Sequence, residues 1–221
     1  MKTFKQFITE QEHPMIDVDG VMKHRNNSEG RPIHPTNEGI RNFHRWFGDS
    51  KAVDQHGRPQ VTYHGTMKDF SAFDKNRYGT MDHGTVGHGI YTSGNKGIAN
   101  NYANKVIGNT KFHEGGNVKP VYMKTHNPIS FDGAMKVKMD ISKERLDKGE
   151  SYASLEQHIG RYTTEKLKSM GHDGVSPTHG EWEGVGDSWT AFHPHQVKSA
   201  IGNNGNFSKD SEHIHEAYEY E

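Results

Sequence analysis

The apolar stretches of this chain are short, and glycine or proline ends almost every one of them. Four stretches gather β-branched and aromatic residues over a few positions, which is typical of strands. Three others place apolar residues three or four positions apart, which predicts helices. Because strands are mixed with interspersed helices along the chain, the pattern predicts an α+β fold. The predicted strands lie within 57–66, 87–93, 118–131 and 187–200, the last two being ended by Pro128 and Pro194, and the predicted helices lie at 36–48, 95–107 and 154–170.

The length of 221 residues suits one domain with tails. Hydrophobic residues make up only 30% of the chain and the mean hydropathy is −0.98, so we expect polar arms around a modest core. We therefore predict an amphipathic arm at 1–10 and a polar linker at 11–35. The folded domain is expected at 36–207, followed by a mobile polar tail at 208–221.

Charge and composition disfavour several functional classes. The net charge is −1, from 27 basic and 28 acidic residues, and no basic block indicates a nucleic-acid partner. Cysteine is absent, which excludes disulfides, cysteine-ligated zinc and a thiol nucleophile. No apolar run approaches the ~18 residues of a membrane span. Four histidines near glycine or proline lack the spacing of a metal motif, so no metal site is predicted: His83, His88, His193 and His195.

The segment VTYHGT at 61–66 places His64 at the last position of a predicted strand, with Gly65 directly after it. A strand end can present a side chain to a ligand at the sheet edge, and glycine lets the backbone approach that ligand closely. The chain has 17 histidines, so a surface or hydrogen-bonded histidine is the commoner explanation for any single one. Tyr91 and Tyr102 likewise either pack as ordinary core rings or form two walls around a flat aromatic ligand.

Taken together, five segments resemble the diphtheria-toxin and PARP-like ADP-ribosyltransferases, and they look closest to the small versions in phage and mobile-element polyvalent proteins. The segments are YHGT, GHGIYTS, ANNYA, VKPVYMKTHNP and WTAFHPHQVKSAIGN, in that order, and the resemblance covers roughly 36–207. It implies a split antiparallel β-sheet core with flanking helices, and NAD as a substrate. It also implies that His64 binds the nicotinamide-side ribose, that the backbone of Gly65 binds the carboxamide, and that Tyr91 and Tyr102 sandwich the nicotinamide.

The resemblance also requires a negative charge near the ribose, because breaking the nicotinamide–ribose bond builds positive charge on the sugar. The glutamate of the family falls on Ser188 in this chain, which leaves three alternatives. Asp187 reaches the site through a one-residue shift, which needs a bulge because strand alternation turns it to the opposite face. Glu183, in the Glu-Trp-Glu loop with Glu181, supplies the charge instead. Or Ser188 only binds the ribose, which leaves a slow transferase or a non-catalytic NAD-binding module.

The N-terminal arm resembles a second group. Phe4, Phe7 and Ile8 share one helical face, and MKTFKQFITE is similar to the capsid-targeting peptides of internal head proteins in T-even-like phages. The prohead protease of that group cuts after a glutamate two residues beyond leucine or isoleucine, which Ile8 and Glu10 satisfy. A second match, Ile214-His215-Glu216, lies near the C-terminus. The alternative is an ordinary amphipathic arm.

These resemblances predict a phage-encoded ADP-ribosyltransferase that uses NAD to modify a host macromolecule. Its expected partners are a host protein acceptor and, through the arm, the prohead scaffold and protease. The expected location is the interior of the phage head and then the host cytoplasm. Two alternatives remain, namely a catalytically degenerate module that inhibits a host defence protein and a structural internal head protein.

Overall fold

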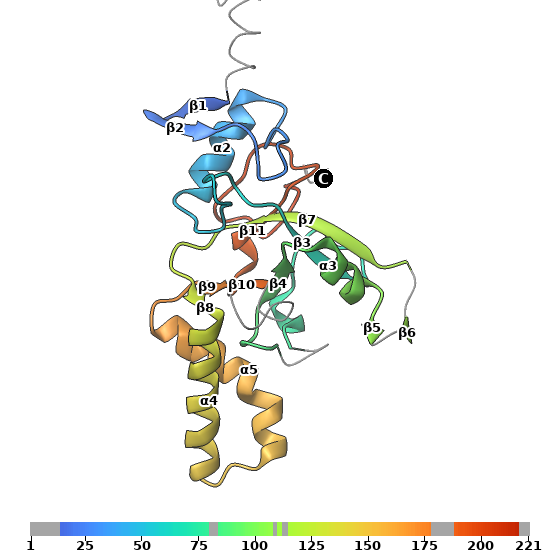
Figure 1. The fold of residues 1–221 in the computed structure, drawn as a ribbon, viewed down its shortest axis with the longest axis vertical. Helices are drawn as coiled ribbons and strands as arrows, with labels where there is room; N and C mark the ends of the chain where they lie inside the picture. Colours follow the sequence, from blue (N-terminus) through green and yellow to red (C-terminus); the bar gives the residue numbers. More distant parts are fainter. Residues whose placement is uncertain (1–13, 80–83, 108–109, 112–114, 178–187, 217–221) are drawn as a thin grey trace, which may run out of the picture.

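The computed structural model of the chain describes residues 14–79, 84–107, 110–111, 115–177 and 188–216. Its centre is a seven-stranded sheet (Figure 1) made of β3 (Thr62–Thr66), β4 (Ile90–Ser93), β7 (Asn117–Met123), β8 (Ile129–Ser130), β9 (Gly174–Ser176), β10 (Ser188–Ala191) and β11 (Val197–Ser199). The strand order is β11-β7-β3-β4-β10-β9-β8. Every neighbouring pair is antiparallel except β8 with β9. The predicted α+β class with an antiparallel core is therefore confirmed.

The sheet is nearly divided between β3 and β4. These two strands pair through a single bridge, Tyr63 opposite Ser93. By contrast, β3 pairs with β7 over five residues and β4 pairs with β10 over four. One half of the sheet is thus β11-β7-β3, and the other is β4-β10-β9-β8. This division is the split that the resemblance implied, and it opens directly after Tyr63.

The helices are α2 (Asn37–Phe47), α3 (Lys96–Ala103), α4 (Phe131–Asp147) and α5 (Tyr152–Ser169). The helix predicted at 36–48 is confirmed as α2: the Thr36 hydroxyl accepts the Gly39 N–H at 3.0 Å, and Gly48 ends the helix with φ +58°. Its Phe43 and Trp46 are buried in the larger core cluster. The helix predicted at 154–170 is confirmed as α5. None of the helices that the structure describes is both long and apolar enough to cross a membrane.

The helix predicted at 95–107 is too long by one turn. The helix α3 ends at Ala103, and Val106–Ile107 forms β5, which pairs with β6 (Thr110–Lys111). The side chain of Asn104 folds back to the Asn100 carbonyl at 3.0 Å. Lys105 then adopts φ +47°, a left-handed conformation that stops the helix. The helical spacing of apolar residues in the sequence continues past this point, but the helical backbone ends here.

Helix α4 was not predicted from the sequence. It begins after Ser130, whose hydroxyl accepts the Gly133 N–H at 3.1 Å, and it forms with α5 a hairpin that projects from the sheet (Figure 1). Only Phe131 and Ala134 of this helix are buried. With so few core positions, the helix has a weak apolar period, which is why spacing alone did not reveal it.

The strand predicted to end at Pro194 is confirmed as β10, and a further strand, β11, follows the proline. Strand β10 lies beside β4, and β11 lies at the far edge of the sheet beside β7. Between them, the 3₁₀ turn η2 (Pro194–Gln196) carries the chain from one half of the sheet to the other. The Gln196 side chain stabilises this crossing because it accepts the His193 N–H at 2.8 Å and donates to the Lys124 carbonyl at 2.9 Å.

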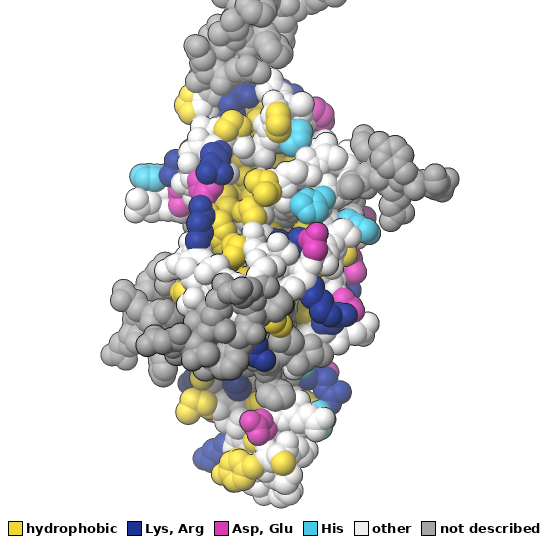
Figure 2. All heavy atoms as spheres, turned by 90° about the vertical axis from the view of Figure 1, so that its right-hand side faces the viewer, with side chains coloured by type: hydrophobic (Ala, Val, Ile, Leu, Met, Phe, Trp, Pro, Cys, Tyr) yellow, Lys and Arg dark blue, Asp and Glu magenta, His cyan; other side chains and the backbone are white. Residues whose placement is uncertain are grey.

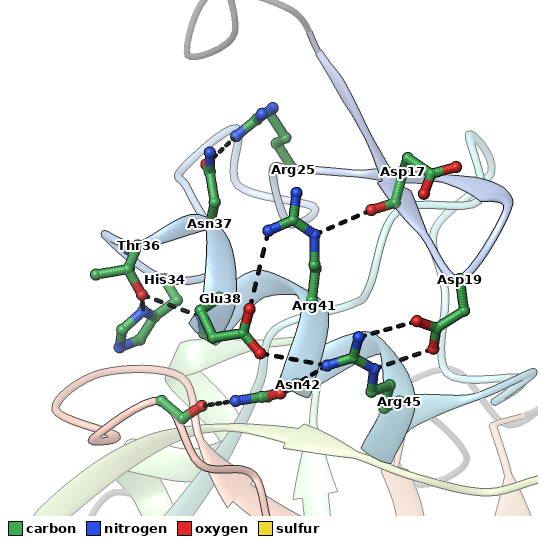
Figure 3. Close-up of polar contacts among 12 residues, drawn as sticks. Asp17, Asp19, Arg25, His34, Thr36, Asn37, Glu38, Arg41, Asn42 and Arg45 are labelled. Carbon is green, nitrogen blue, oxygen red and sulfur yellow. Dashed lines mark hydrogen bonds and ion pairs between the residues drawn. The ribbon is translucent and has the colours of Figure 1, made fainter. Parts of the chain in front are cut away.

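Most of the segment predicted as a polar linker, 11–35, is folded from residue 14 onward. Strands β1 (Met15–Val18) and β2 (Val21–His24) form a hairpin whose Ile16 and Val18 are buried. The hairpin is fixed to α2 by polar contacts (Figure 3). Arg45 donates to both carboxylate oxygens of Asp19 at 2.9 and 3.0 Å, and Arg41 donates to the Asp17 carbonyl at 3.2 Å. The linker prediction was wrong because only alternate residues of a hairpin strand need to be apolar for the strand to pack on the core.

The predicted mobile tail is also partly folded. Ile214 is fully buried, and the Glu216 carboxylate binds Lys198, which is itself fully buried. Residues 217–221 lie outside the described residues, as does the predicted arm at 1–10. The tail therefore belongs to the folded unit as far as residue 216.

Candidate functional site

The gap between β3 and β4 is closed by a side chain instead of a backbone ladder. His64 follows the single Tyr63–Ser93 bridge, and its Nδ1 lies 2.8 Å from the carbonyl oxygen of Tyr91. A carbonyl oxygen only accepts hydrogen bonds, so Nδ1 carries the proton. The imidazole thus connects the two halves of the sheet just where their strands separate.

Two aromatic rings flank the imidazole. The ring centroids of Phe73 and Phe70 lie 4.9 and 6.0 Å from that of His64, both edge-on. Burial lowers the pKa of His64, and the positive charge of Lys119 lowers it further against the opposing effect of the Tyr91 carbonyl. The ring is therefore neutral at pH 7, with its lone pair on Nε2. In this tautomer Nε2 can accept a hydrogen bond from a sugar hydroxyl.

Tyr91 is held at both ends. Its backbone carbonyl accepts the His64 bond, and its hydroxyl donates to the Gly87 carbonyl at 2.5 Å and accepts the Val86 N–H at 3.1 Å. The ring packs against the smaller core cluster, which contains Val86 and Phe192. His64 and Tyr91 are therefore brought together, and the tyrosine also fixes the loop that precedes β4.

Gly65 is positioned by α3. A Cβ on Gly65 would lie 1.8 Å from the Ala99 carbonyl oxygen and 2.9 Å from the Ala103 nitrogen. The glycine is thus required for helix packing, a role that its position after His64 did not predict. Tyr102 lies on the same helix with 62% of its surface exposed. The face on the side of α3 carries a group of hydrophobic side chains with basic and acidic side chains interspersed around it (Figure 2).

Ser188 begins β10 and lies opposite Ser93, which is itself opposite Tyr63. Because side chains alternate along a strand, Ser188 and Thr190 share one face of the sheet, and Trp189 points to the other. Trp189 is buried in the larger core cluster. Ser188, on which the resemblance places the family's glutamate, therefore lies level with the bridge between the two halves. The other candidate acids, Asp187, Glu183 and Glu181, lie outside the described residues.

Several contacts around the site were not predicted from the sequence. Phe70 and Phe73 cover the imidazole, and the only sequence signal for them is their spacing of three in DFSAF. Tyr63 donates its hydroxyl to Glu29, and Lys96 at the start of α3 lies 3.3 Å from the same carboxylate. This contact between distant segments fixes the first turn of α3 over β3.

The histidines considered as metal ligands do not form a cluster in the part of the chain that the structure describes. His193 and His195 stack with ring centroids 5.3 Å apart, and His83 lies outside the described residues. No group of three or more histidine, cysteine, aspartate or glutamate side chains suitable for a metal ion occurs among the described residues.

Comparison with known proteins identifies one family. A family model described as ADP-Ribosyltransferase in polyvalent proteins matches residues 54–207, which is more than half of the chain. The match spans the gap between β3 and β4, all of α3 and Ser188. No curated protein and no solved structure matches the chain.

The contact between Gly65 and α3 can be tested by stability. We expect Gly65→Ala to lower the free energy of unfolding by about 2–3 kcal/mol, because the new methyl group overlaps the backbone of Ala99. Gly97→Ala is the matched control, since its Cβ would meet only the Asn95 side chain at 3.1 Å and alanine favours the helix. Urea denaturation of both variants checks this. Equal stability of the two would show that α3 does not pack as described.

Proposed function

The chain belongs to the family of ADP-ribosyltransferases in polyvalent proteins, and from this premise we propose that it transfers ADP-ribose from NAD to a host macromolecule. The observation that carries the proposal is the hydrogen bond to the Tyr91 carbonyl that holds the imidazole of His64 at the gap between β3 and β4. The residues that the resemblance assigns to NAD lie on the elements around this gap, namely β3, β4, α3 and β10. NAD acts as a substrate in this proposal, and no step needs a metal.

In the proposed complex, the nicotinamide end of NAD enters the gap. The Nε2 atom of His64 accepts a hydrogen bond from a ribose hydroxyl, which is supported by the Nδ1–H tautomer that the Tyr91 carbonyl imposes. Tyr91 contributes one wall for the pyridine ring, and the exposed Tyr102 closes over the other side. Tyr91 is fixed and suits a preformed wall. Tyr102 is solvent-accessible and suits a wall that closes on the ligand.

The proposed reaction breaks the bond between C1′ of the ribose and the nicotinamide nitrogen. The bonding electrons go to the nitrogen, which neutralises the pyridinium and releases nicotinamide, and positive charge develops on the sugar. A nucleophilic atom of the acceptor then forms a bond to C1′ and loses its proton to solvent. A carboxylate near the ribose stabilises the charged intermediate. We assign this role to Asp187 or Glu183, with Ser188 as a ribose ligand.

The role of His64 is tested by release of nicotinamide. We expect His64→Ala to lower the rate on the order of 100-fold in the presence of NAD and host lysate, because the ribose loses its orienting contact. His56→Ala is the matched control, since His56 is exposed and lies in a turn outside the gap. Chromatographic measurement of nicotinamide gives both rates. A wild-type protein that releases no nicotinamide at any dose would favour the inhibitor described below.

The source of the negative charge is tested by three single substitutions. We expect either Asp187→Asn or Glu183→Gln to lower nicotinamide release on the order of 100-fold, because a neutral isostere cannot stabilise the developing positive charge. Ser188→Ala should have a smaller effect, since it removes one hydrogen bond and no charge. If only Ser188→Ala lowers the rate, the carboxylate assignment is wrong.

A second candidate function is binding without turnover, in which the fold inhibits a host defence protein. Ser188 at the position of the family glutamate favours it. This inhibitor would still bind NAD if the gap is intact, and NAD would raise the melting temperature according to RT ln(1 + [L]/Kd). Binding without nicotinamide release identifies the inhibitor, and neither binding nor release identifies a structural head protein.

We also propose that residues 1–10 direct the protein into the phage prohead, where the prohead protease cuts after Glu10. The support is the pattern Ile8-Thr9-Glu10 with its apolar helical face. The competing match at Ile214-His215-Glu216 is protected by the fold, because Ile214 is fully buried and Glu216 is 7% exposed. The cleaved protein would then be delivered with the DNA to the host cytoplasm.

Terminal analysis of the protein from purified virions tests this proposal. We expect an N-terminus at Gln11 and a C-terminus beyond Glu216, since a protease needs an accessible, unfolded segment. An Ile8→Ala variant should keep its first residues because it lacks the recognition pattern. Absence of the protein from virions, or an uncut N-terminus there, contradicts the proposal.

A further inference from the structure

The C-terminal segment 211–216 crosses the edge of the sheet beside β11. The Ile214 carbonyl accepts the Ser199 N–H of β11 at 2.8 Å, and the Ile214 N–H donates to the Ser71 carbonyl at 2.8 Å. Ala72 and His213 form an antiparallel bridge at the same place. Ile214 thus links the last strand of the sheet to the segment around residue 72.

The segment is anchored by a buried ion pair. Lys198 of β11 is fully buried and donates to the Ser211 carbonyl at 2.8 Å, to the His213 carbonyl at 3.2 Å and to the Glu216 carboxylate. The second carboxylate oxygen of Glu216 accepts the Ser208 N–H at 2.9 Å. A buried charge needs such partners, so removing one of them leaves the other uncompensated. Nothing in the proposed chemistry uses this pair.

The other side of the segment holds the residues that cover His64. Lys75 lies 2.6 Å from Glu212, close to the Ala72–His213 bridge. Between these contacts lies Phe73, which is buried and packs 4.9 Å from the imidazole of His64, centroid to centroid. Lys119, whose charge lowers the pKa of His64, pairs with Asp69 at 2.5 Å.

We propose that residues 211–216 act as a strap that holds Phe70 and Phe73 against His64, and that Lys198 and Glu216 are positioning residues for the imidazole. The continuous path runs from the buried ion pair through Ile214 and the Ala72–His213 bridge to Phe73. The strap keeps water from one side of the ring and keeps Nδ1 in line with the Tyr91 carbonyl. The catalytic consequence rests on the proposed transferase function, whereas the geometric consequence does not.

The test loosens the strap and then restores it. Glu216→Gln removes the charge of the anchor while retaining its shape, and Glu144→Gln is the matched control in the exposed Lys148–Glu144 pair of α4. Because the chain has no cysteine, the pair Ala72→Cys and His213→Cys can introduce one disulfide at the bridge, where facing residues have suitable Cα separations. The disulfide is added to the Glu216→Gln protein and compared in oxidised and reduced forms.

The first readout is the titration of the His64 ring by NMR, assigned by its loss in His64→Gln. We expect Glu216→Gln to raise the pKa of His64 toward its ordinary range, since the ring becomes hydrated. The oxidised disulfide should reverse this rise, and reduction should bring it back. A merely structural role elsewhere in the fold would not move this titration. Glu144→Gln should leave it unchanged.

The second readout is nicotinamide release, for which we expect about a 10- to 100-fold loss of kcat/KM in Glu216→Gln, restored by the oxidised disulfide. An unchanged His64 titration in folded Glu216→Gln, or no restoration by the disulfide, overturns the strap. If Glu216→Gln does not fold, the test uses Glu212→Gln, which removes only the exposed Lys75 contact. This variant must also raise the pKa of His64, and an unchanged pKa contradicts the proposal. A wild-type protein without turnover whose His64 titration still responds would refute the transferase and leave the strap standing.

Discussion

The hydrogen bond from His64 Nδ1 to the Tyr91 carbonyl joins the two halves of the sheet at the point where their backbone ladder ends. Without it, β3 and β4 would share only the Tyr63–Ser93 bridge. The same bond determines the tautomer of the imidazole, because the carbonyl can only accept. One interaction therefore sets both the width of the gap and the atom, Nε2, that is left to meet a ligand. His64 therefore serves both to connect the sheet and to present Nε2 to a ligand.

The surroundings of the bond are built by close packing. Gly65 allows the backbone of α3 to lie directly on β3, and the contact of Lys96 and Tyr63 with Glu29 holds the first turn of that helix. On the other side, Phe73 packs edge-on against the imidazole. Because the residues that hold the gap lie on strands and a helix, the loops around this framework can vary without moving it.

The sequence predicted the parts of this site that depend on local order. Tyr91 follows a glycine-framed turn and lies in β4, as predicted. The prediction that His64 ends its strand is wrong, because β3 continues through Gly65 to Thr66 in its pairing with β7. The roles of these residues in binding NAD stay predictions. Helix α4 was missed because only Phe131 and Ala134 contact the core, and α3 was extended too far because Lys105 breaks the helix with a backbone angle that spacing does not reveal.

What the sequence by itself determined is the fold class, the helices α2 and α5, and the motif order that places a histidine and a tyrosine on neighbouring strands. These features are local, because periodicity, caps and turn residues act over a few positions. Only the tertiary structure decided that the hairpin at 15–24 and the segment up to Glu216 belong to the fold. Lysine is rarely buried without a partner, and Lys198 is fully buried beside Glu216. Pairing between distant residues depends on how the whole sheet closes, and no local pattern carries that information.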